Sequence, residues 1–192
     1  MRENQIRTIS QNICTRADEQ TGDKYISGYF SVFGSDYEMW PGASESIDPG
    51  AFDGALVDDI RCLVDHESRL VLGRTKAGTL FLKVDKHGLW GEVRINGKDQ
   101  DAVNLYERVL RGDVNQCSFG FDILDEEMTE DPVSGDIHWI IKKVKLYEVS
   151  IVTFPAYKDT EVTARKNEYD EIRKRKEEKW RSDMKRRLKG EF

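Results

Sequence analysis

The chain has 192 residues, of which 38% are hydrophobic and 34% are charged, and its formal net charge is −6. This length predicts one domain with an additional segment, because domains most often contain about 100–150 residues. No apolar run approaches the roughly 18 residues that a membrane span needs, and the first five residues (MRENQ) lack the apolar stretch of a secretory signal. We therefore expect neither a membrane span nor a signal peptide.

Charge is distributed unevenly along the chain. Residues 165–192 hold 12 Lys/Arg and 7 Asp/Glu, a net charge of +5, whereas residues 1–164 hold 18 basic and 29 acidic residues, a net charge of −11. Such asymmetry predicts two parts with different roles, a domain at 1–164 and a basic, helical or flexible tail at 165–192. The acidic domain argues against nucleic-acid binding.

The three cysteines, Cys14, Cys62 and Cys117, are an odd number without a CxxC spacing. They predict reduced thiols in a cytoplasmic setting and argue against a disulfide framework or a zinc site. The sequence also lacks GxGxxG, Walker-type, HExxH and GxSxG motifs. We therefore expect no cofactor and no metal.

The first half of the chain predicts strands separated by turns. Aromatic and β-branched residues predict a strand at 25–33, and Asp48-Pro49 predicts the start of a short helix that ends near residue 56 or 57. Further strands are predicted at 59–66, 69–74, 79–85 and 88–95. Glycines in the turns between the last three strands predict an antiparallel meander.

The second half begins with helical spacing at 99–111, followed by Gly112 as a C-cap. A strand is predicted at 115–124, an acidic turn-rich excursion at 125–136 and a long strand or strand pair at 137–153. The pattern favours a mainly β fold with helices (α+β), arranged as a closed antiparallel β-barrel of about seven strands with helices outside.

The sequence has only three histidines, so a mechanism that needs an imidazole has few candidate residues. His66 ends an apolar strand beside Asp65, just before a loop, and a polar group at the end of a rigid strand is well placed to act as a base. His87 lies in a tight turn and His138 opens a strand, which is typical of exposed or half-exposed residues. The pattern by itself leaves a purely structural role open for all three.

Ser118 is the candidate nucleophile. Alternation places it on one strand face with Gly120, while the neighbouring Cys117 points to the core with two phenylalanines. A glycine there would allow another chain to approach closely. Serine is a weak nucleophile unless a base takes its proton, so this hypothesis needs a nearby histidine. The alternatives are an ordinary strand serine or Cys117 as the nucleophile.

Glu148 is an unusual acid within an apolar strand. Alternation places it on one face with Val144, Leu146, Ser150 and Val152. A carboxylate among apolar residues costs free energy unless it has a partner. A histidine N–H or one of the nearby lysines could supply that partner.

Five stretches of the sequence together resemble the prohead proteases of tailed bacteriophages, which are related to the herpesvirus assemblins. They are 28–33 (GYFSVF), 48–56 (DPGAFDGAL), 63–73 (LVDHESRLVLG), 115–121 (NQCSFGF) and 146–156 (LYEVSIVTFPA). The resemblance covers about residues 25–164, and the order and spacing of the five stretches are those of the family.

The resemblance implies a serine, a histidine and a third polar residue as the catalytic set. The family's DH motif is matched at His66, its SxGF motif at Ser118, and its EVSxVxxPA motif at Glu148. Herpesvirus relatives have a second histidine as the third member, and phage members have the glutamate; His138 is the fallback for this role. By this interpretation His66 takes the proton of Ser118, Glu148 orients the imidazole, and backbone N–H groups form the oxyanion hole.

The resemblance also implies an assemblin-like barrel, and cleavage of the scaffold segment of the major capsid protein inside the immature capsid, usually with self-cleavage. It implies a homodimer that is made in the host cytoplasm and packaged inside the prohead. The partners implied are the major capsid protein and its scaffold segment, to which the basic tail could dock.

Two other functions compete with this interpretation. The barrel could serve only as a structural capsid-assembly or scaffold component, which would show neither cleavage nor labelling of Ser118. Alternatively, the basic tail could bind nucleic acid. Its seven acidic residues and lack of clustered aromatic side chains weaken that hypothesis.

Overall fold

The computed structural model of the chain describes residues 2–10, 13–154 and 159–188. Its strands are β1 (Arg2–Ser10), β2 (Cys14–Ala17), β3 (Lys24–Val32), β4 (Tyr37–Trp40), β5 (Ala43–Ile47), β6 (Arg61–Val64), β7 (Glu67–Arg74), β8 (Leu80–Val84), β9 (Gly88–Ile95), β10 (Gln116–Glu130) and β11 (Ile137–Val152). Its helices are the short 3₁₀ segments η1 (Ala55–Val57) and η2 (Thr75–Ala77) and the α-helices α1 (Gln100–Arg111) and α2 (Asp159–Leu188).

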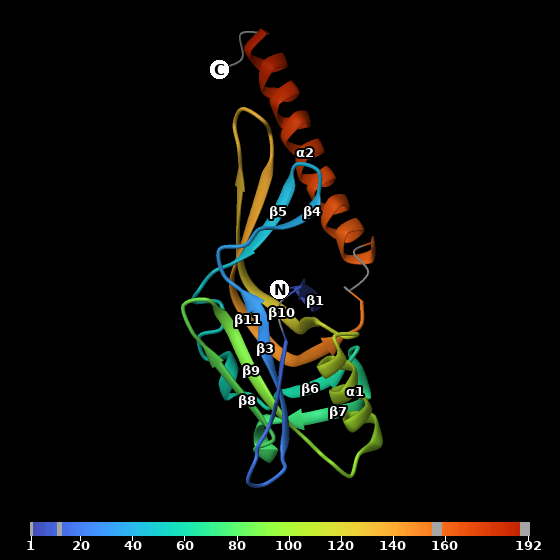
Figure 1. Ribbon diagram of the computed structural model, residues 1–192. Coiled ribbons are helices and arrows are strands. Elements are labelled where there is room, and N and C mark those ends of the chain that lie inside the picture. Colours follow the sequence, from blue (N-terminus) through green and yellow to red (C-terminus); the bar gives the residue numbers. More distant parts are fainter. Residues whose placement is uncertain (1, 11–12, 155–158, 189–192) are drawn as a thin grey trace. The chain divides into compact units, whose positions relative to one another are not determined.

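The described strands form two sheets. A seven-stranded sheet has the order β1-β10-β11-β5-β4, with β6 paired to β11 and β7 paired to β6, and a four-stranded sheet has the order β2-β3-β9-β8. The two longest of the described strands, β10 and β11, pair as an antiparallel hairpin. Strand β5 runs parallel to the start of β11 and β6 runs parallel to its end, and Figure 1 shows these two strands at opposite ends of the hairpin.

The fold class is mainly β with few helices, as predicted, but the predicted closed barrel is wrong. Both sheets are open over the residues that the structure describes. A barrel closes only when the two edge strands of one sheet pair with each other. Here β11 takes β5 along one half of its free edge and β6 along the other half, so the larger sheet branches instead of closing.

The helix expected after Asp48 is also wrong, because residues 49–54 form successive turns that lead to η1. The Asp48 carboxylate accepts a hydrogen bond from the N–H of Gly50 at 2.8 Å, which closes a local turn, and Gly54 has a φ of 78° that a helix cannot contain. The acidic excursion is shorter than expected, since β10 continues to Glu130. Strands β1, β2, β4 and β5 were not predicted.

Helix α1 forms close to its predicted bounds because both ends are capped. The Asp99 carboxylate accepts hydrogen bonds from the N–H groups of Asp101 and Ala102, and Gly112 adopts the left-handed conformation at the other end. The helix buries one face, made by Ala102, Leu105, Tyr106 and Val109.

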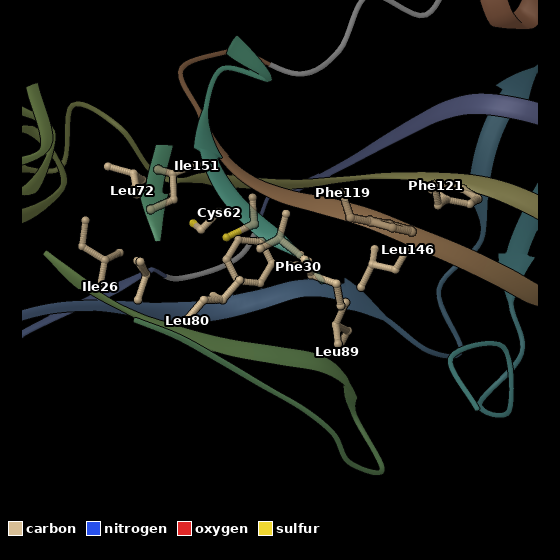
Figure 2. Packing of buried hydrophobic residues seen from close by; sticks show 14 of the residues in the cluster. Ile26, Phe30, Cys62, Leu72, Leu80, Leu89, Phe119, Phe121, Leu146 and Ile151 are labelled. Carbon is tan, nitrogen blue, oxygen red and sulfur yellow. The ribbon is translucent and has the colours of Figure 1, made fainter. Parts of the chain in front are cut away.

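The hydrophobic core lies between the two sheets, and Figure 2 shows side chains from both of them interleaved. Strands β3, β8 and β9 contribute Ile26, Phe30, Leu80 and Leu89, and strands β10 and β11 contribute Cys117, Phe119, Phe121, Leu146 and Ile151. The rings of Phe119 and Phe121 are stacked with centroids 4.6 Å apart. As the alternation predicted, Cys117 and the two phenylalanines face the core, so the opposite face of β10 is left for Ser118.

Residues 1–156 and 157–192 form two separate compact units. The boundary predicted at 164/165 lies within α2, which begins at Asp159. Helix α2 is strongly charged, and ion pairs one turn apart, such as Arg181 with Glu177 at 2.7 Å, lie along it. Trp180 and Met184 are exposed. None of the helices described is both long and apolar enough to cross a membrane.

Candidate active site

Three chain segments that are distant in sequence meet at the C-terminal end of β11. Antiparallel pairing places Gly120 of β10 opposite Glu148 of β11 and Ser118 opposite Ser150. Parallel pairing places Leu63 of β6 beside Ser150, so the turn that follows β6 emerges next to this part of β11. Ser118, Glu148 and the turn residue His66 therefore lie around one point of the sheet.

His66 lies in the tight turn between β6 and β7, not on the strand face where the alternation predicted it. Asp65 and His66 have φ angles of 47° and 60°, the left-handed conformation that a two-residue hairpin connection requires. This conformation is costly for residues other than glycine and persists only where the surroundings hold it. The N–H of Asp65 donates to the Ile151 carbonyl at 3.0 Å, and the Asp65 carboxylate accepts from the N–H of Thr153 at 2.7 Å. These bonds fasten the turn to the end of β11.

The imidazole of His66 lies between the other two predicted site residues. Its Nδ1 is 2.6 Å from Glu148 Oε1, and its Nε2 is 2.8 Å from Ser118 Oγ. A carboxylate only accepts hydrogen bonds, so Nδ1 carries the proton and Nε2 is the free acceptor that faces the hydroxyl. The His66 side chain is 20% exposed, the Glu148 side chain is 14% exposed, and Ser118 is fully buried. The arrangement can transfer a proton from the serine to the imidazole and hold the resulting cation against a carboxylate.

The Glu148 carboxylate is fixed on both of its oxygens. Its Oε1 accepts from His66, and its Oε2 accepts from the hydroxyl of the fully buried Ser150 at 2.6 Å. Gly120 makes room for this carboxylate, since a Cβ at that position would lie 2.3 Å from Oε1. The glycine was expected to allow another chain to approach, whereas the group that approaches is the side chain of Glu148.

Comparison with known proteins gives a family. A family model described as caudovirus prohead serine protease matches residues 11–175. This is most of the chain. The chain belongs to the caudovirus prohead serine protease family. Family membership makes it a protease of capsid maturation.

The fold also resembles a solved structure. The bacteriophage T4 capsid assembly protease, gp21, matches with a TM-score of 0.52 and 13% sequence identity, over 80% of this chain and 98% of that chain. No curated protein matches the sequence. Two residues of the family-like stretch 146–156, Pro155 and Ala156, lie outside the described residues.

Neither buried cysteine is available as the nucleophile of this protease. Cys117 is next to Ser118 in the chain but lies on the opposite face of β10, where burial raises its thiol pKa to about 12. Burial also raises the pKa of the Cys62 thiol well above its usual value. A thiol needs to be ionised to attack, so at neutral pH both act as small core side chains.

The other two histidines lie elsewhere. His138, the fallback for the third site residue, is ten residues before Glu148, roughly 30 Å along β11. Its ring nitrogens are 2.8 Å from Ser44 Oγ and 2.7 Å from Ser46 Oγ. His87 lies in the turn between β8 and β9, where its ring contacts the ring of Tyr29 of β3.

Three further contributors to the site were not predicted. Ser150 follows Glu148 by two residues, so its place on the same strand face was available from the alternation. The role of the Asp65 carboxylate in fastening the turn became clear only from its hydrogen bonds to Thr153, which is 88 residues away. Thr8 of β1 donates to Ser118 Oγ at 3.1 Å, and the β-branched residues in the stretch IRTIS were the available signal for that strand.

Proposed function

We propose that the chain is a serine endopeptidase of capsid maturation in which Ser118 is the nucleophile, His66 the general base and Glu148 the group that orients the imidazole. The observation that carries this proposal is the continuous hydrogen-bonded series from Ser118 Oγ through His66 to Glu148, at 2.8 Å and 2.6 Å. Distances in this range are those at which a nucleophile and its base act together.

The chemistry follows from the positions of the protons. Ser118 Oγ attacks the scissile carbonyl carbon while His66 Nε2 takes the hydroxyl proton, and the imidazolium passes that proton to the departing amine. Water then attacks the acyl-enzyme with His66 again as base, which releases the acid and the free serine. The negative charge of Glu148 stabilises the imidazolium, and the Ser150 hydroxyl holds that carboxylate in position. Backbone N–H groups are the expected donors to the oxyanion.

Family membership supports a substrate inside the immature capsid. We propose that the enzyme cleaves the scaffold segment of the major capsid protein, and also itself, after it has been packaged into the prohead in the host cell. We propose further that it works as a homodimer. The alternative is a capsid-assembly component without catalytic activity, and the complete burial of Ser118 is the observation that favours it.

Co-expression with the major capsid protein of the same phage tests the proposal. The wild-type chain should generate new termini in the capsid protein, identified by mass spectrometry, and Ser118→Ala should abolish them. Ser134→Ala is the matched control, because Ser134 lies in the exposed turn between β10 and β11 and should leave processing unchanged. Processing by the Ser118→Ala chain at the wild-type level would exclude Ser118 as the nucleophile.

A serine-directed phosphonate separates the protease from the non-catalytic alternative. Covalent labelling of Ser118, located by mass spectrometry, requires an activated hydroxyl. It should be lost in His66→Ala, although the serine is still present. A folded chain that remains unlabelled after prolonged incubation supports the non-catalytic alternative.

A further inference from the structure

Strand β1 covers the nucleophile. It pairs antiparallel with β10, and Thr8 lies directly opposite Ser118. The Thr8 hydroxyl donates to Ser118 Oγ at 3.1 Å, and Ser118 Oγ lies 2.9 Å from the carbonyl oxygen of Arg7, to which it can donate. Because Ser118 has no exposed surface, a substrate carbonyl cannot reach it while β1 occupies this place.

The contact with Arg7 also competes with the proposed chemistry. A serine hydroxyl has one proton, and Ser118 Oγ has two acceptors at similar distances, His66 Nε2 at 2.8 Å and the Arg7 carbonyl at 2.9 Å. General-base catalysis needs that proton to be directed to the imidazole. In a serine protease the group next to the nucleophile is a carbonyl of the substrate, and here a backbone carbonyl of β1 occupies that position.

The position of β1 in the sheet is that of an added strand. It is at the end of the strand order, next to β10, and an extended peptide binds a protein by pairing with such an edge strand. The match to the protease family begins at residue 11, so β1 precedes the matched residues. Replacing β1 by a substrate segment in the same register would keep the β10 ladder intact and place a substrate carbonyl at Ser118.

One side chain of β1, that of Arg7, pairs with a buried acid, Glu45. The Arg7 guanidinium makes two hydrogen bonds to the Glu45 carboxylate, at 2.5 Å and 3.0 Å, and the two side chains are 5% and 1% exposed. They line a cavity of about 240 Å³ whose wall also includes Asp36, Tyr37 and Phe119. If an incoming strand covered Glu45 in place of β1 and brought no cation, the carboxylate would be buried without this guanidinium, which is strongly unfavourable. An incoming strand would therefore have to supply a cation there.

We propose that the edge of β10 now covered by β1 is the binding site for the extended substrate segment, and that Glu45 selects an arginine or lysine of the substrate at the position of Arg7. Strand β1 is the resident occupant, and substrate binding exchanges one strand for another. The proposal rests on the proposed protease function and adds a specificity to it. Because the carbonyl of this basic residue lies next to Ser118, the bond that is cut follows the basic residue.

A reversible lock on β1 tests the exchange and leaves Arg7, Thr8 and Ser118 unchanged. Ile9 lies directly opposite Cys117 in the register of β1 and β10, so Ile9→Cys places a second thiol beside a native one. The variant is made in a Cys14→Ser background and folded under oxidising conditions, and mass spectrometry confirms the disulfide. Phosphonate labelling of Ser118 should be at least about tenfold slower in the oxidised chain than after reduction. The Cys14→Ser chain is the control and should show no dependence on reductant.

A peptide with the sequence of residues 2–10 (RENQIRTIS) tests the specificity by binding alone. The full-length acceptor carries Arg7→Gln to weaken the resident strand and Ser118→Ala to prevent any cleavage. The fluorescent peptide should bind this acceptor, and a peptide with glutamate in place of the arginine that corresponds to Arg7 should bind at least about tenfold more weakly. The oxidised lock, in the same Ser118→Ala background, should not bind either peptide.

These outcomes separate the two proposals. Equal labelling of the oxidised and reduced lock shows that β1 does not have to leave and overturns the exchange. Equal binding of the arginine and glutamate peptides, or no binding of either, overturns the selection by Glu45. If the chain binds the arginine peptide selectively but Ser118 is never labelled, the strand site stands and the serine protease function fails.

Discussion

A histidine lies next to a serine at each end of β11, but the second ring nitrogen has a different partner in the two histidines. At the start of the strand, His138 lies between two hydroxyls, Ser44 at 2.8 Å from Nδ1 and Ser46 at 2.7 Å from Nε2. At the other end, the ring of His66 lies between the hydroxyl of Ser118 and a carboxylate that is itself held by Ser150.

The difference shows that a histidine and serine pair without an acid has no group that fixes which ring nitrogen carries the proton. Hydroxyls can donate or accept, so neither nitrogen of His138 is assigned a fixed protonation state by its two serine partners. A carboxylate accepts only, which fixes the proton on Nδ1 of His66 and leaves Nε2 as a base. The carboxylate of Asp36 is 4.0 Å from Nε2 of His138, the same nitrogen that faces Ser46, and the Asp36 side chain is 68% exposed.

The largest expected effect distinguishes the two histidines directly. His66→Ala should lower kcat/KM for capsid-protein processing by about 10⁴-fold or more, because the base and nucleophile act as a unit. His138→Ala should remain within about threefold of wild type, since that residue only bridges β5 and β11. Rates of appearance of cleaved capsid protein measure both. A similar loss in the two variants would remove the distinction between the ends of β11.

Replacing the acid should have a smaller but still large effect. Glu148→Gln keeps the shape of the side chain and removes its charge, which should lower kcat by about 10²–10⁴-fold, less than the loss of His66. Glu19→Gln is the matched control, because Glu19 is an exposed residue of the turn between β2 and β3, and it should have no measurable effect on kcat. If Glu148→Gln and His66→Ala lost equal activity, the orienting role of Glu148 would not hold.

Gly120→Ala should act through Glu148. The added methyl would lie 2.3 Å from Oε1, so the carboxylate must move away from His66. We expect kcat to fall about 10–100-fold and the free energy of unfolding to fall by about 1–3 kcal/mol. Gly97→Ala is the control, because no atom lies within 4 Å of a Cβ at that position. Denaturant unfolding with activity assays measures both quantities, and unchanged kcat would show that Glu148 needs no such space.

The smallest effect concerns the thiols. Burial raises the Cys117 pKa to about 12, so at pH 8 its thiolate is roughly a 10⁻⁴ fraction of the population. Iodoacetamide should therefore modify only the exposed Cys14 of the folded chain and leave phosphonate labelling of Ser118 unchanged. Raising the pH towards 12 should increase the reactivity of Cys117. Rapid alkylation of Cys117 at pH 8, seen by peptide mass spectrometry, would contradict its placement in the core.

Local patterns determined those parts of the protein that depend on neighbours in sequence. Period-two alternation placed Cys117 and the two phenylalanines of β10 in the core, and the caps Asp99 and Gly112 delimited α1, because both signals act within a few residues. The motifs around His66, Ser118 and Glu148 indicated the family, which the match over residues 11–175 shows.

Tertiary structure decided which strands pair, and pairing set the geometry of the site. Alternation gives the face of a strand but not its neighbour, so it could not show that β11 would take β6 along one half of its edge and β5 along the other, or that the sheets would stay open. The conformation of His66 depends on hydrogen bonds between Asp65 and residues near the end of β11. The cover over Ser118 comes from Arg7 and Thr8, which are 111 and 110 residues away along the chain. Contacts at that separation are selected by the packing of the whole sheet, and no local pattern contains them.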